Sequence, residues 1–334
     1  MSFEKDIHII AEAGTNHNGE LKKAKNLVDI AVRAQTDSVK FQIIYPEGLY
    51  LPGKYEYGHY DIEEVIKIRR DGMLSDDEYS ELAEYSNSKN MAMSASIFDV
   101  RGLDLLTKFN PLYIKTASCD LNNIRLLKKI AERGFKMVIS TGMSTLSDID
   151  FTLNELNKIN FTNYVLLHCV SVYPAYLKDT NLNFLETLKN EFNCEIGFSD
   201  HTGDSIAASV ALAKGATWFE KHFTEDRTQK GFDHAYALEA EELMEYVTNL
   251  KDTYHSLNEK KEKINDNEMY TRKRARRSLY ASRKISAGDI INEDDVLIVR
   301  PEAEMDANEV YQIIGKKVKR TIYKHEPFSL KMVE

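Results

Sequence analysis

Two short stretches, Cys194-Glu-Ile-Gly-Phe-Ser-Asp-His201 and Ala216-Thr-Trp-Phe-Glu-Lys-His222, decide how this chain folds. Each contains an apolar run typical of a strand buried on both faces, and each delivers a histidine where the apolar residues stop. Neutral imidazoles at the ends of two adjacent parallel strands can share one divalent metal ion. We therefore predict a parallel sheet with His201 and His222 close together at one of its ends.

Similar apolar runs recur along the chain before these two. The predicted strands are Ile7–Ala11, Ser38–Ile43, Met91–Ser96, Leu112–Thr116, Met137–Ser140, Tyr164–His168, Glu195–Phe198 and Thr217–Glu220. Helical patterns lie between them, for example Leu21–Ala34, Asp76–Lys89, Ile124–Arg133, Leu146–Ile159, Thr202–Lys214 and Ala240–Leu257. Eight strand–helix units in about 255 residues predict an α/β fold, a (β/α)8 or TIM barrel. A doubly wound open sheet is the alternative, but it often carries a Gly-rich phosphate fingerprint that Ala13–Gly19 lacks.

The chain changes texture after the last helical pattern. Residues 258–277 are charged and have almost no apolar face, which predicts a linker. From Ser278 onward the sequence is rich in β and turn patterns, and about 55 residues is near the lower limit for an independent core. We expect a catalytic barrel over residues 1–257, a linker over 258–277 and a small domain over 278–334.

Composition narrows the class of protein. The 334 residues carry a formal net charge of −9, which is unusual for a nucleic-acid-binding protein. The three cysteines, Cys119, Cys169 and Cys194, lack Cys-x-x-Cys spacing, so a disulfide framework is not expected. No apolar run approaches the length of a membrane span, and the charged start does not resemble a signal peptide. We expect a cytoplasmic protein with neither nucleic acid nor membrane as partner.

Two lysines interrupt apolar strands. Lys40 lies between Val39 and Phe41, and Lys115 lies between Ile114 and Thr116. A buried lysine needs an anion, which is either an interior carboxylate such as Glu12 or Glu220, or a bound phosphate. Ser96, Ser118, Ser140 and Ser199 stand at the carboxyl ends of predicted strands, where barrels of this type have their active sites. Ammonium and hydroxyl groups together favour a phosphate pocket.

The histidines are expected to have different roles, depending on whether they occur singly or as a pair. A single strand-end histidine such as His168 is expected to be a hydrogen-bonded wall residue, whereas His201 and His222 form a pair on adjacent strands. Two nitrogen ligands leave open positions for water and substrate, which suits a Lewis acid acting on a carbonyl group. Asp200 and Lys221 are expected to support this pair or to point outward.

The motifs taken together resemble one family. Ile10–Gly19, Val39–Gln42, Tyr113–Ser118, Ser140–Met143, Gly197–His201 and Glu220–Phe223 are similar to the sialic acid synthases. Ser278–Ala281, Lys284–Gly288 and Val299–Pro301 resemble the C-terminal antifreeze-like SAF domain of that family, a small β-clip. The resemblance implies that phosphoenolpyruvate condenses with an N-acetylhexosamine, N-acetylmannosamine in the leading case, and water. The products would be N-acetylneuraminate and phosphate, released by C–O cleavage.

The resemblance also implies roles for residues at matching positions. Phosphoenolpyruvate would be held by Lys40, Ser96, Lys115, Ser118, Ser140, Ser171 and Ser199; Mn2+, Mg2+ or Co2+ by His201 and His222; and the sugar by Gln42, Tyr173, Asp233 and Arg300. Glu12 and Asp120 would handle protons and the attacking water. Arg300 would reach the site from the other subunit of a domain-swapped homodimer.

Several positions depart from the family pattern. Asp120 and Ser171 replace a usual Glu and a usual Asn, and Tyr60 or a neighbour stands where a sugar-binding Asn is expected. Phe232 replaces the Pro of a Gly-Pro-Asp segment, and residues 235–238 lack a usual Ser. These changes leave open an alternative acceptor, a 2,4-diacetamido-trideoxyhexose, with legionaminate or pseudaminate as product. A non-catalytic polysaccharide-assembly protein and a metal-dependent pyruvate aldolase are the alternatives from other classes.

Overall fold

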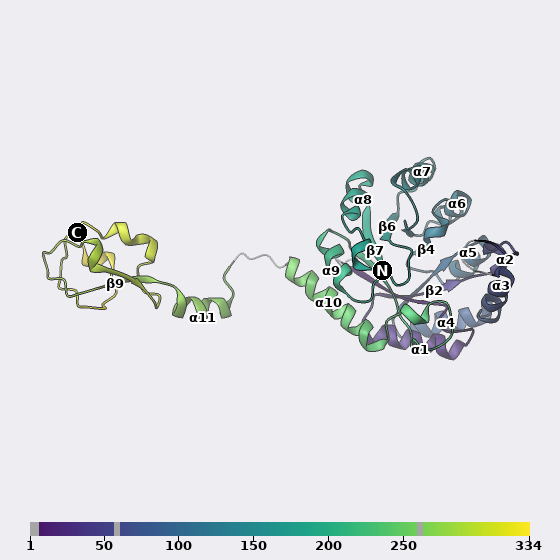
Figure 1. The fold of residues 1–334 in the computed structure, drawn as a ribbon, viewed down its shortest axis with the longest axis horizontal. Coiled ribbons are helices and arrows are strands. Elements are labelled where there is room, and N and C mark those ends of the chain that lie inside the picture. Colours follow the sequence, from purple (N-terminus) through teal and green to yellow (C-terminus); the bar gives the residue numbers. More distant parts are fainter. Residues whose placement is uncertain (1–6, 57–60, 259–262) are drawn as a thin grey trace. The chain divides into compact units, whose positions relative to one another are not determined.

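The computed structural model describes residues 7–56, 61–258 and 263–334, and the chain divides into two compact units, residues 1–258 and 259–334. In the first unit eight strands close into a barrel in chain order, and β1 pairs in parallel with β8 (Figure 1). The strands are β1 (His8–Gly14), β2 (Ser38–Ile43), β3 (Ala92–Ile97), β4 (Ile114–Thr116), β5 (Met137–Ser140), β6 (Tyr164–Cys169), β7 (Glu195–Asp200) and β8 (Trp218–His222). The predicted TIM barrel is confirmed.

Helices surround the barrel strands (Figure 1). They are α1 (Leu21–Arg33), α2 (Pro46–Leu49), α3 (Ile62–Asp71), α4 (Asp76–Ser88), α5 (Val100–Thr107), α6 (Ile124–Glu132), α7 (Leu146–Asn157), α8 (Phe184–Phe192), α9 (Ile206–Ala213) and α10 (Ala240–Asn258). The predicted start of α9 at Thr202 is wrong by four residues. The Asp200 carboxylate accepts hydrogen bonds from the backbone N–H and the hydroxyl of Thr202, which holds the chain in a turn there.

Successive residues along each strand alternate between two environments. Outward residues such as Ile9, Phe41 and Phe198 belong to the large core between strands and helices. Inward residues such as Trp218 and Leu167 form a smaller apolar cluster inside the barrel. Polar residues of the same inward parity follow toward the carboxyl ends of the strands, so the barrel interior is apolar at one end and polar at the other.

The second unit has its own small core. Strands β9 (Ser278–Ala281) and β10 (Val296–Val299) form an antiparallel pair. The buried residues include Leu279, Ile285, Ile291, Ile313 and Phe328. Helix α11 (Asp266–Ala275) occupies half of the segment that was predicted as a linker.

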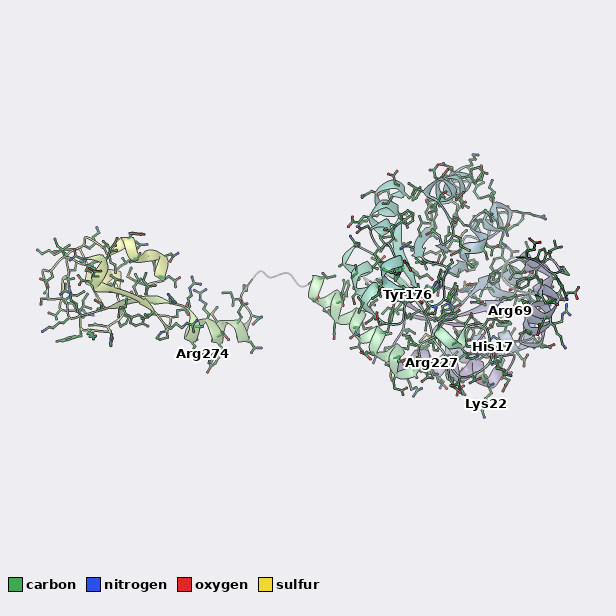
Figure 2. All side chains as sticks on the ribbon, viewed as in Figure 1. His17, Lys22, Arg69, Tyr176, Arg227 and Arg274 are labelled. Atoms are coloured by element: carbon green, nitrogen blue, oxygen red, sulfur yellow. The ribbon has the colours of Figure 1, made fainter. Side chains whose placement is uncertain are left out.

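Helix α11 is attached to this second unit through its basic side chains. Arg272 Nε donates to a carboxylate oxygen of Glu302 at 2.6 Å, and Arg276 makes two bonds of 3.0 Å to Asp306. The neighbouring Arg274 is exposed (Figure 2). Part of the charge that suggested a linker therefore forms ion pairs within the unit.

Two further observations bear on the sequence analysis. Within the part of the chain that the structure describes, no helix has both the length and the apolar character needed to cross a membrane. Cys119, Cys169 and Cys194 are all free thiols.

Candidate active site

Inward-facing polar residues from neighbouring strands meet at the carboxyl end of the barrel. The strand register places Glu12 opposite both Lys40 and His222, and Ser199 opposite Glu220. All five residues are buried. Residues that are up to 210 positions apart in the sequence therefore share one polar mouth, as expected for strand ends of a parallel barrel.

Lys40 is neutralised by interior carboxylates. Its Nζ lies 2.6 Å from Glu12 Oε2 and 3.5 Å from Glu220 Oε2, and it donates to Ser96 Oγ at 2.8 Å. Burial lowers the pKa of Lys40, but the two carboxylates outweigh burial and raise this pKa above its ordinary value. Of the two anions that the sequence left open for this lysine, the structure contains the interior carboxylates.

Glu12 is the carboxylate in this group whose proton is held most tightly. Burial raises the pKa of Glu12 to about 7 even though Lys40 lies beside it, and the charge of Glu220 adds to this effect. Gln42 Nε2 donates to the other oxygen of Glu12 at 2.8 Å. Glu12 is therefore positioned by two neighbours and is able to exchange a proton near neutral pH.

Lys115 differs from Lys40 because it has no carboxylate partner within ion-pair distance in the described ranges. Its Nζ donates to the backbone oxygen of Thr116 at 2.7 Å and to Ser140 Oγ at 2.6 Å. Burial lowers the pKa of Lys115, which is the direction expected for an ammonium group with too little compensating charge. This lysine is the cation of the mouth that is available to a bound anion.

Small side chains surround Gly142, two residues after the Ser140 that bonds Lys115, and we call this group the cradle. They can come together because Gly142 has no side chain. The Gly142 N–H donates to Ser118 Oγ at 3.1 Å, and Cys169 Sγ lies 3.3 Å from the same hydroxyl. A Cβ at Gly142 would lie 2.3 Å from Ser171 Oγ and 2.8 Å from Ser118 Oγ. Sequence reasoning quoted Gly142 within a motif but did not identify it as the residue that lets these hydroxyls approach.

His201 and His222 lie side by side, with ring centroids 5.6 Å apart. His201 Nδ1 lies 2.7 Å from the Val170 carbonyl oxygen, so Nδ1 carries the proton and Nε2 keeps its lone pair. His222 Nδ1 is buried without a hydrogen-bond partner. Burial lowers the pKa of both rings, that of His201 to about 4, so both are neutral at pH 7.

This donor set fits a divalent metal ion that keeps open coordination positions. Two neutral imidazoles with unused lone pairs are suitable ligands for such an ion. No group of three or more His, Cys, Asp or Glu side chains is arranged to hold a metal within the described ranges. The protein would therefore supply two ligands, and water and substrate would supply the others.

Aromatic and acidic groups line the side of the mouth expected to meet the sugar. The ring centroids of Tyr173 and His201 lie 4.2 Å apart, and those of Tyr236 and His222 lie 5.3 Å apart. The Tyr236 hydroxyl donates to Asp233 Oδ1 at 2.6 Å, while Asp233 Oδ2 is buried without a partner. Sequence reasoning missed Tyr236, although an aromatic residue three positions after a predicted sugar-binding aspartate was a usable signal.

The remaining expected residues make contacts of their own or belong to other parts of the chain. Asp120 accepts from Asn123 Nδ2 at 3.0 Å, and burial raises the pKa of its carboxyl group. His168 Nε2 bonds the Thr180 carbonyl at 2.6 Å, as expected for a wall residue. Arg300 belongs to the second unit, and Tyr60 lies outside the described residues.

Asp200 and Lys221 form a buried pair directly behind the two histidines. Lys221 Nζ lies 3.2 Å from Asp200 Oδ2, and the same ammonium group lies 5.1 Å from the centre of the Tyr246 ring on α10. These residues are next to His201 and His222 in the sequence, and they have the opposite, outward parity. The pair therefore ties the ends of β7 and β8 together and fixes the spacing of the imidazoles.

Comparisons with known proteins agree with this geometry. A model of the NeuB family matches residues 27–262, and a model of the SAF domain matches residues 276–334. An uncharacterised protein of Methanocaldococcus jannaschii is 35% identical over 93% of this chain and 90% of its own length. The N,N'-diacetyllegionaminic acid synthase of Legionella pneumophila is 32% identical over 93% of this chain and 90% of its own.

A solved structure is similar as well. The N-acetylneuraminic acid synthetase of Leptospira borgpetersenii, crystallised with citrate, superposes with a TM-score of 0.70 at 33% identity. The match covers 80% of this chain and 90% of that one. The chain therefore belongs to the NeuB family and ends in an SAF domain.

Proposed function

We propose that this chain condenses phosphoenolpyruvate with the open-chain aldehyde of an N-acetylated amino sugar and with water, giving a nine-carbon 2-keto acid and phosphate. Family membership supports the reaction class, because the chain is a NeuB-family nonulosonate synthase, a transferase that uses phosphoenolpyruvate. Relatives named for legionaminic and for sialic acid are 32% and 33% identical, so identity does not choose between the two acceptors.

One observation supports the proposed reaction most directly. The ammonium group of Lys115, which bonds only neutral groups, and the neutral pair His201 and His222 lie at the same barrel mouth. Lys115 with Ser140 and the cradle at Gly142 would hold an anionic substrate. Each partner of Lys40 Nζ is already a buried side chain, so we propose that Lys40 acts mainly through its charge and by holding Glu12 and Glu220.

The residues then suggest a sequence of steps. A divalent metal held by His201 and His222, Mn2+ in the first instance, would supply Lewis-acid polarisation of the sugar aldehyde. The C2–C3 π electrons of phosphoenolpyruvate form the bond from C3 to the aldehyde carbon, and the aldehyde π electrons move to its oxygen, which takes up a proton and becomes a hydroxyl group. Positive charge develops at C2 near Glu12 and Glu220. Water adds to C2 while Glu12 takes its proton, with Asp120 as the alternative base.

Phosphate leaves last. The C2 hydroxyl group loses its proton and becomes the keto oxygen, and the bond between C2 and the bridging oxygen breaks with its electron pair going to phosphate. Lys115 stabilises the charge of the departing group. Phosphoenolpyruvate labelled with 18O in the bridging position should therefore yield labelled phosphate, and label retained in the keto acid would rule out C–O cleavage.

The subunit arrangement rests on the family resemblance. We propose a domain-swapped homodimer in which Arg300 reaches the sugar site of the other subunit. We also propose that the protein is located in the cytoplasm. Arg300→Ala should raise KM for the sugar and leave KM for phosphoenolpyruvate unchanged. Light scattering that gives the mass of one chain would contradict the swapped arrangement.

The central test measures phosphate release together with metal content. His222→Gln should abolish both turnover and retained Mn2+, whereas His168→Gln, the same change at a wall histidine, should preserve both. Circular dichroism checks that each variant is folded. Normal turnover by folded His222→Gln would refute the metal site. Absence of phosphate release from the unmodified protein with every amino sugar would favour a non-catalytic role.

A further inference from the structure

Lys221 is buried behind the histidine pair, and oxygen atoms surround its ammonium group. Nζ lies 3.2 Å from Asp200 Oδ2, donates to the carbonyl oxygen of Thr202 and lies 3.4 Å from the carbonyl oxygen of Asp204. Carbonyl and carboxylate oxygens can only accept hydrogen bonds, whereas an ammonium group has three N–H donors. The three acceptors therefore match the three protons of a charged Lys221.

An aromatic ring completes these surroundings. The ammonium nitrogen lies 5.1 Å from the centre of the Tyr246 ring, within the range of a cation–π interaction. Lys221 is 2% exposed and Tyr246 is 1% exposed, so both are shielded from bulk water. Main-chain carbonyls and aromatic faces are groups that replace the water around a monovalent cation. We call the three oxygens and the Tyr246 ring the cation cage.

The cation cage holds the backbone on both sides of His201. Asp200 precedes this histidine, Thr202 follows it, and Asp200 Oδ1 accepts from the Thr202 N–H at 2.8 Å. Lys221 precedes His222 on β8, so its ammonium group joins the turn after β7 to the neighbouring strand. The cation cage therefore fixes the turn that carries His201 relative to the strand that carries His222.

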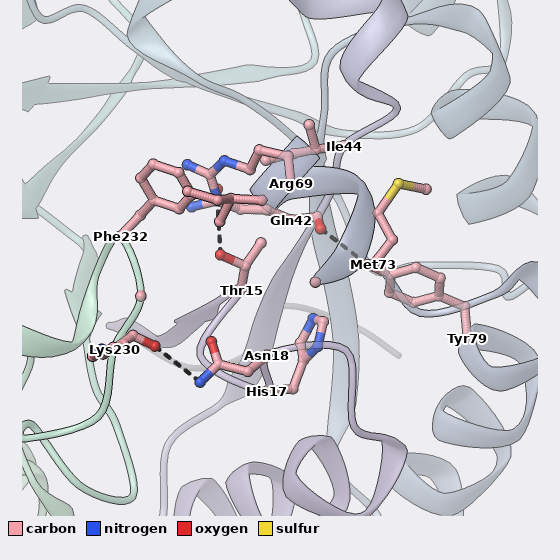
Figure 3. Close-up of a pocket in the computed structure, with 13 residues that line it drawn as sticks. Thr15, His17, Asn18, Gln42, Ile44, Arg69, Met73, Tyr79, Lys230 and Phe232 are labelled. Atoms are coloured by element: carbon pink, nitrogen blue, oxygen red, sulfur yellow. Dashed lines mark hydrogen bonds between the residues drawn. The ribbon is translucent and has the colours of Figure 1, made fainter. Parts of the chain in front are cut away.

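The cation cage is separate from the cavity beside the barrel mouth. Figure 3 shows this cavity of about 350 Å³, where the guanidinium carbon of Arg69 lies 3.7 Å from the centre of the Phe232 ring. None of the residues that line the cavity belongs to the cation cage. Changes at Lys221 can therefore be made without altering the lining of the cavity.

We infer that the cation cage is a site for a monovalent cation of the ammonium type, and that the side chain of Lys221 permanently occupies it. This resident cation positions the two imidazoles for the divalent metal ion. That second part rests on the proposed metal site, whereas the cage itself is defined without the divalent metal. The unmodified protein then needs neither K+ nor NH4+, and a protein that lacks the Lys221 ammonium group needs one of them.

The alternative is an ion pair that stabilises the fold and has no further role. Such a pair requires only Asp200, whereas two of the three acceptors are main-chain carbonyls of one turn. Gly203 and Asp204 in this turn are exposed, so a small cation from solvent can enter once the lysine side chain is shortened. The two explanations therefore differ in the effect that they predict for added cations.

The test replaces Lys221 by side chains of different volume. Lys221→Ala leaves space for a cation, whereas Lys221→Met fills the same space with carbon. In choline chloride, whose cation is too large for the cage, both variants should bind Mn2+ about tenfold more weakly than the unmodified protein in calorimetric titration. Ammonium or potassium chloride should restore the affinity of Lys221→Ala and leave that of Lys221→Met low. Lys158→Ala, at an exposed lysine paired with Glu155, should match the unmodified protein in every salt.

A second readout does not depend on the divalent metal. The Tm of metal-free Lys221→Ala should be higher in ammonium chloride than in choline chloride of equal ionic strength, because the cation binds only the folded cage. The Tm of Lys221→Met and of the unmodified protein should change equally little between the two salts. If Lys221→Ala is unfolded in choline chloride, ammonium should restore its circular dichroism. Absence of any specific response of Lys221→Ala to ammonium or potassium overturns the cation site.

The charge of Asp200 supplies the last control. The double variant Lys221→Ala with Asp200→Asn lacks the anion of the cage, so ammonium should not raise its Tm; the same rise as in Lys221→Ala would place the effect elsewhere and overturn the inference. If ammonium raises the Tm of Lys221→Ala while Mn2+ affinity is equal in all variants, the cage does not position the imidazoles. If the unmodified protein binds no Mn2+ in any salt, the proposed metal site fails and the Tm comparison still decides on the cage.

Discussion

Replacing the two buried lysines by methionine should change the stability of the barrel in different directions. Lys40 lies between Glu12 and Glu220, whereas Lys115 has only neutral partners. Both lysine residues are buried to a similar degree, 2% exposed in each case. The comparison therefore separates the effect of direct ion pairs from the effect of burial, because the carboxylate of Glu220 acts on Lys115 only through its charge and not as a direct ion-pair partner.

The expected magnitudes follow from these partners. Lys40→Met leaves two buried carboxylates without their cation, which typically costs about 3–5 kcal/mol. For a barrel of this size that corresponds to a fall in Tm of roughly 10 °C. Lys115→Met removes a buried charge that lacks a carboxylate, and the relief from desolvation offsets two lost hydrogen bonds of about 1 kcal/mol each. We expect no change, or a gain of up to about 2 kcal/mol.

The assay is calorimetry of the metal-free protein, followed by phosphate release. Phosphoenolpyruvate should raise the Tm of the unmodified barrel but not that of Lys115→Met, because the substrate binds only the native state. KM for phosphoenolpyruvate should rise about a hundredfold in Lys115→Met, the effect of one buried charge-assisted bond. If Lys115→Met is as unstable as Lys40→Met, or if it keeps a normal KM, Lys115 is structural.

Three further predictions concern the same mouth. Gly142→Ala should raise KM for phosphoenolpyruvate while the fold is kept, because its Cβ would lie 2.3 Å from Ser171 Oγ. Steady-state kinetics would test this. An unchanged KM would show that the hydroxyl groups around Gly142 do not bind phosphoenolpyruvate. Lys221→Met should weaken Mn2+ binding about tenfold, because the ends of β7 and β8 would be held less firmly; calorimetric titration measures this affinity. An unchanged affinity would mean that the Lys221–Asp200 ion pair does not position the metal-binding histidines. The value of kcat/KM should rise as the pH passes through about 7, where Glu12 loses its proton and becomes a base. Glu220→Gln should move this rise to lower pH, because the charge of Glu220 raises the pKa of Glu12. A pH profile that Glu220→Gln leaves unaltered would contradict this effect of Glu220 on Glu12.

Much of the mouth was predictable because strand periodicity determines which side chains face inward. Near the carboxyl ends of β1, β2 and β8 the polar inward residues are Glu12, Lys40, Gln42, Glu220 and His222, all of even number, and the register brings these strand ends together. Once the eight strands were identified, their carboxyl ends had to meet. The predicted juxtaposition of His201 and His222 therefore needed no information about loops.

Residues outside the strands were less accessible to prediction. Phe232 and Tyr236 lie between β8 and α10, Tyr236 in a 3-10 helix of three residues, and Arg69 lies on α3, which was not predicted. No periodicity connects such segments to the mouth, because their positions depend on packing between loops that are distant in sequence. The choice of anion for Lys40 was also undetermined, since strand parity places Glu12 and a substrate phosphate on the same face.

The arrangement around Lys40 explains why a buried glutamate can serve as base at neutral pH. One ammonium group is shared by two carboxylates, so it compensates the charge of only one of them. The positive charges of Lys115 and Lys40 lower the pKa of Glu220 despite its burial, and a hydrogen bond of 2.8 Å from Ser199 also favours its ionised form. Glu12 is left as the carboxylate that is costly to ionise, and its pKa rises to about 7. A glutamate paired with Lys40 alone would be ionised well below pH 7 and would be a weaker base, so Glu220 tunes Glu12 rather than duplicating it.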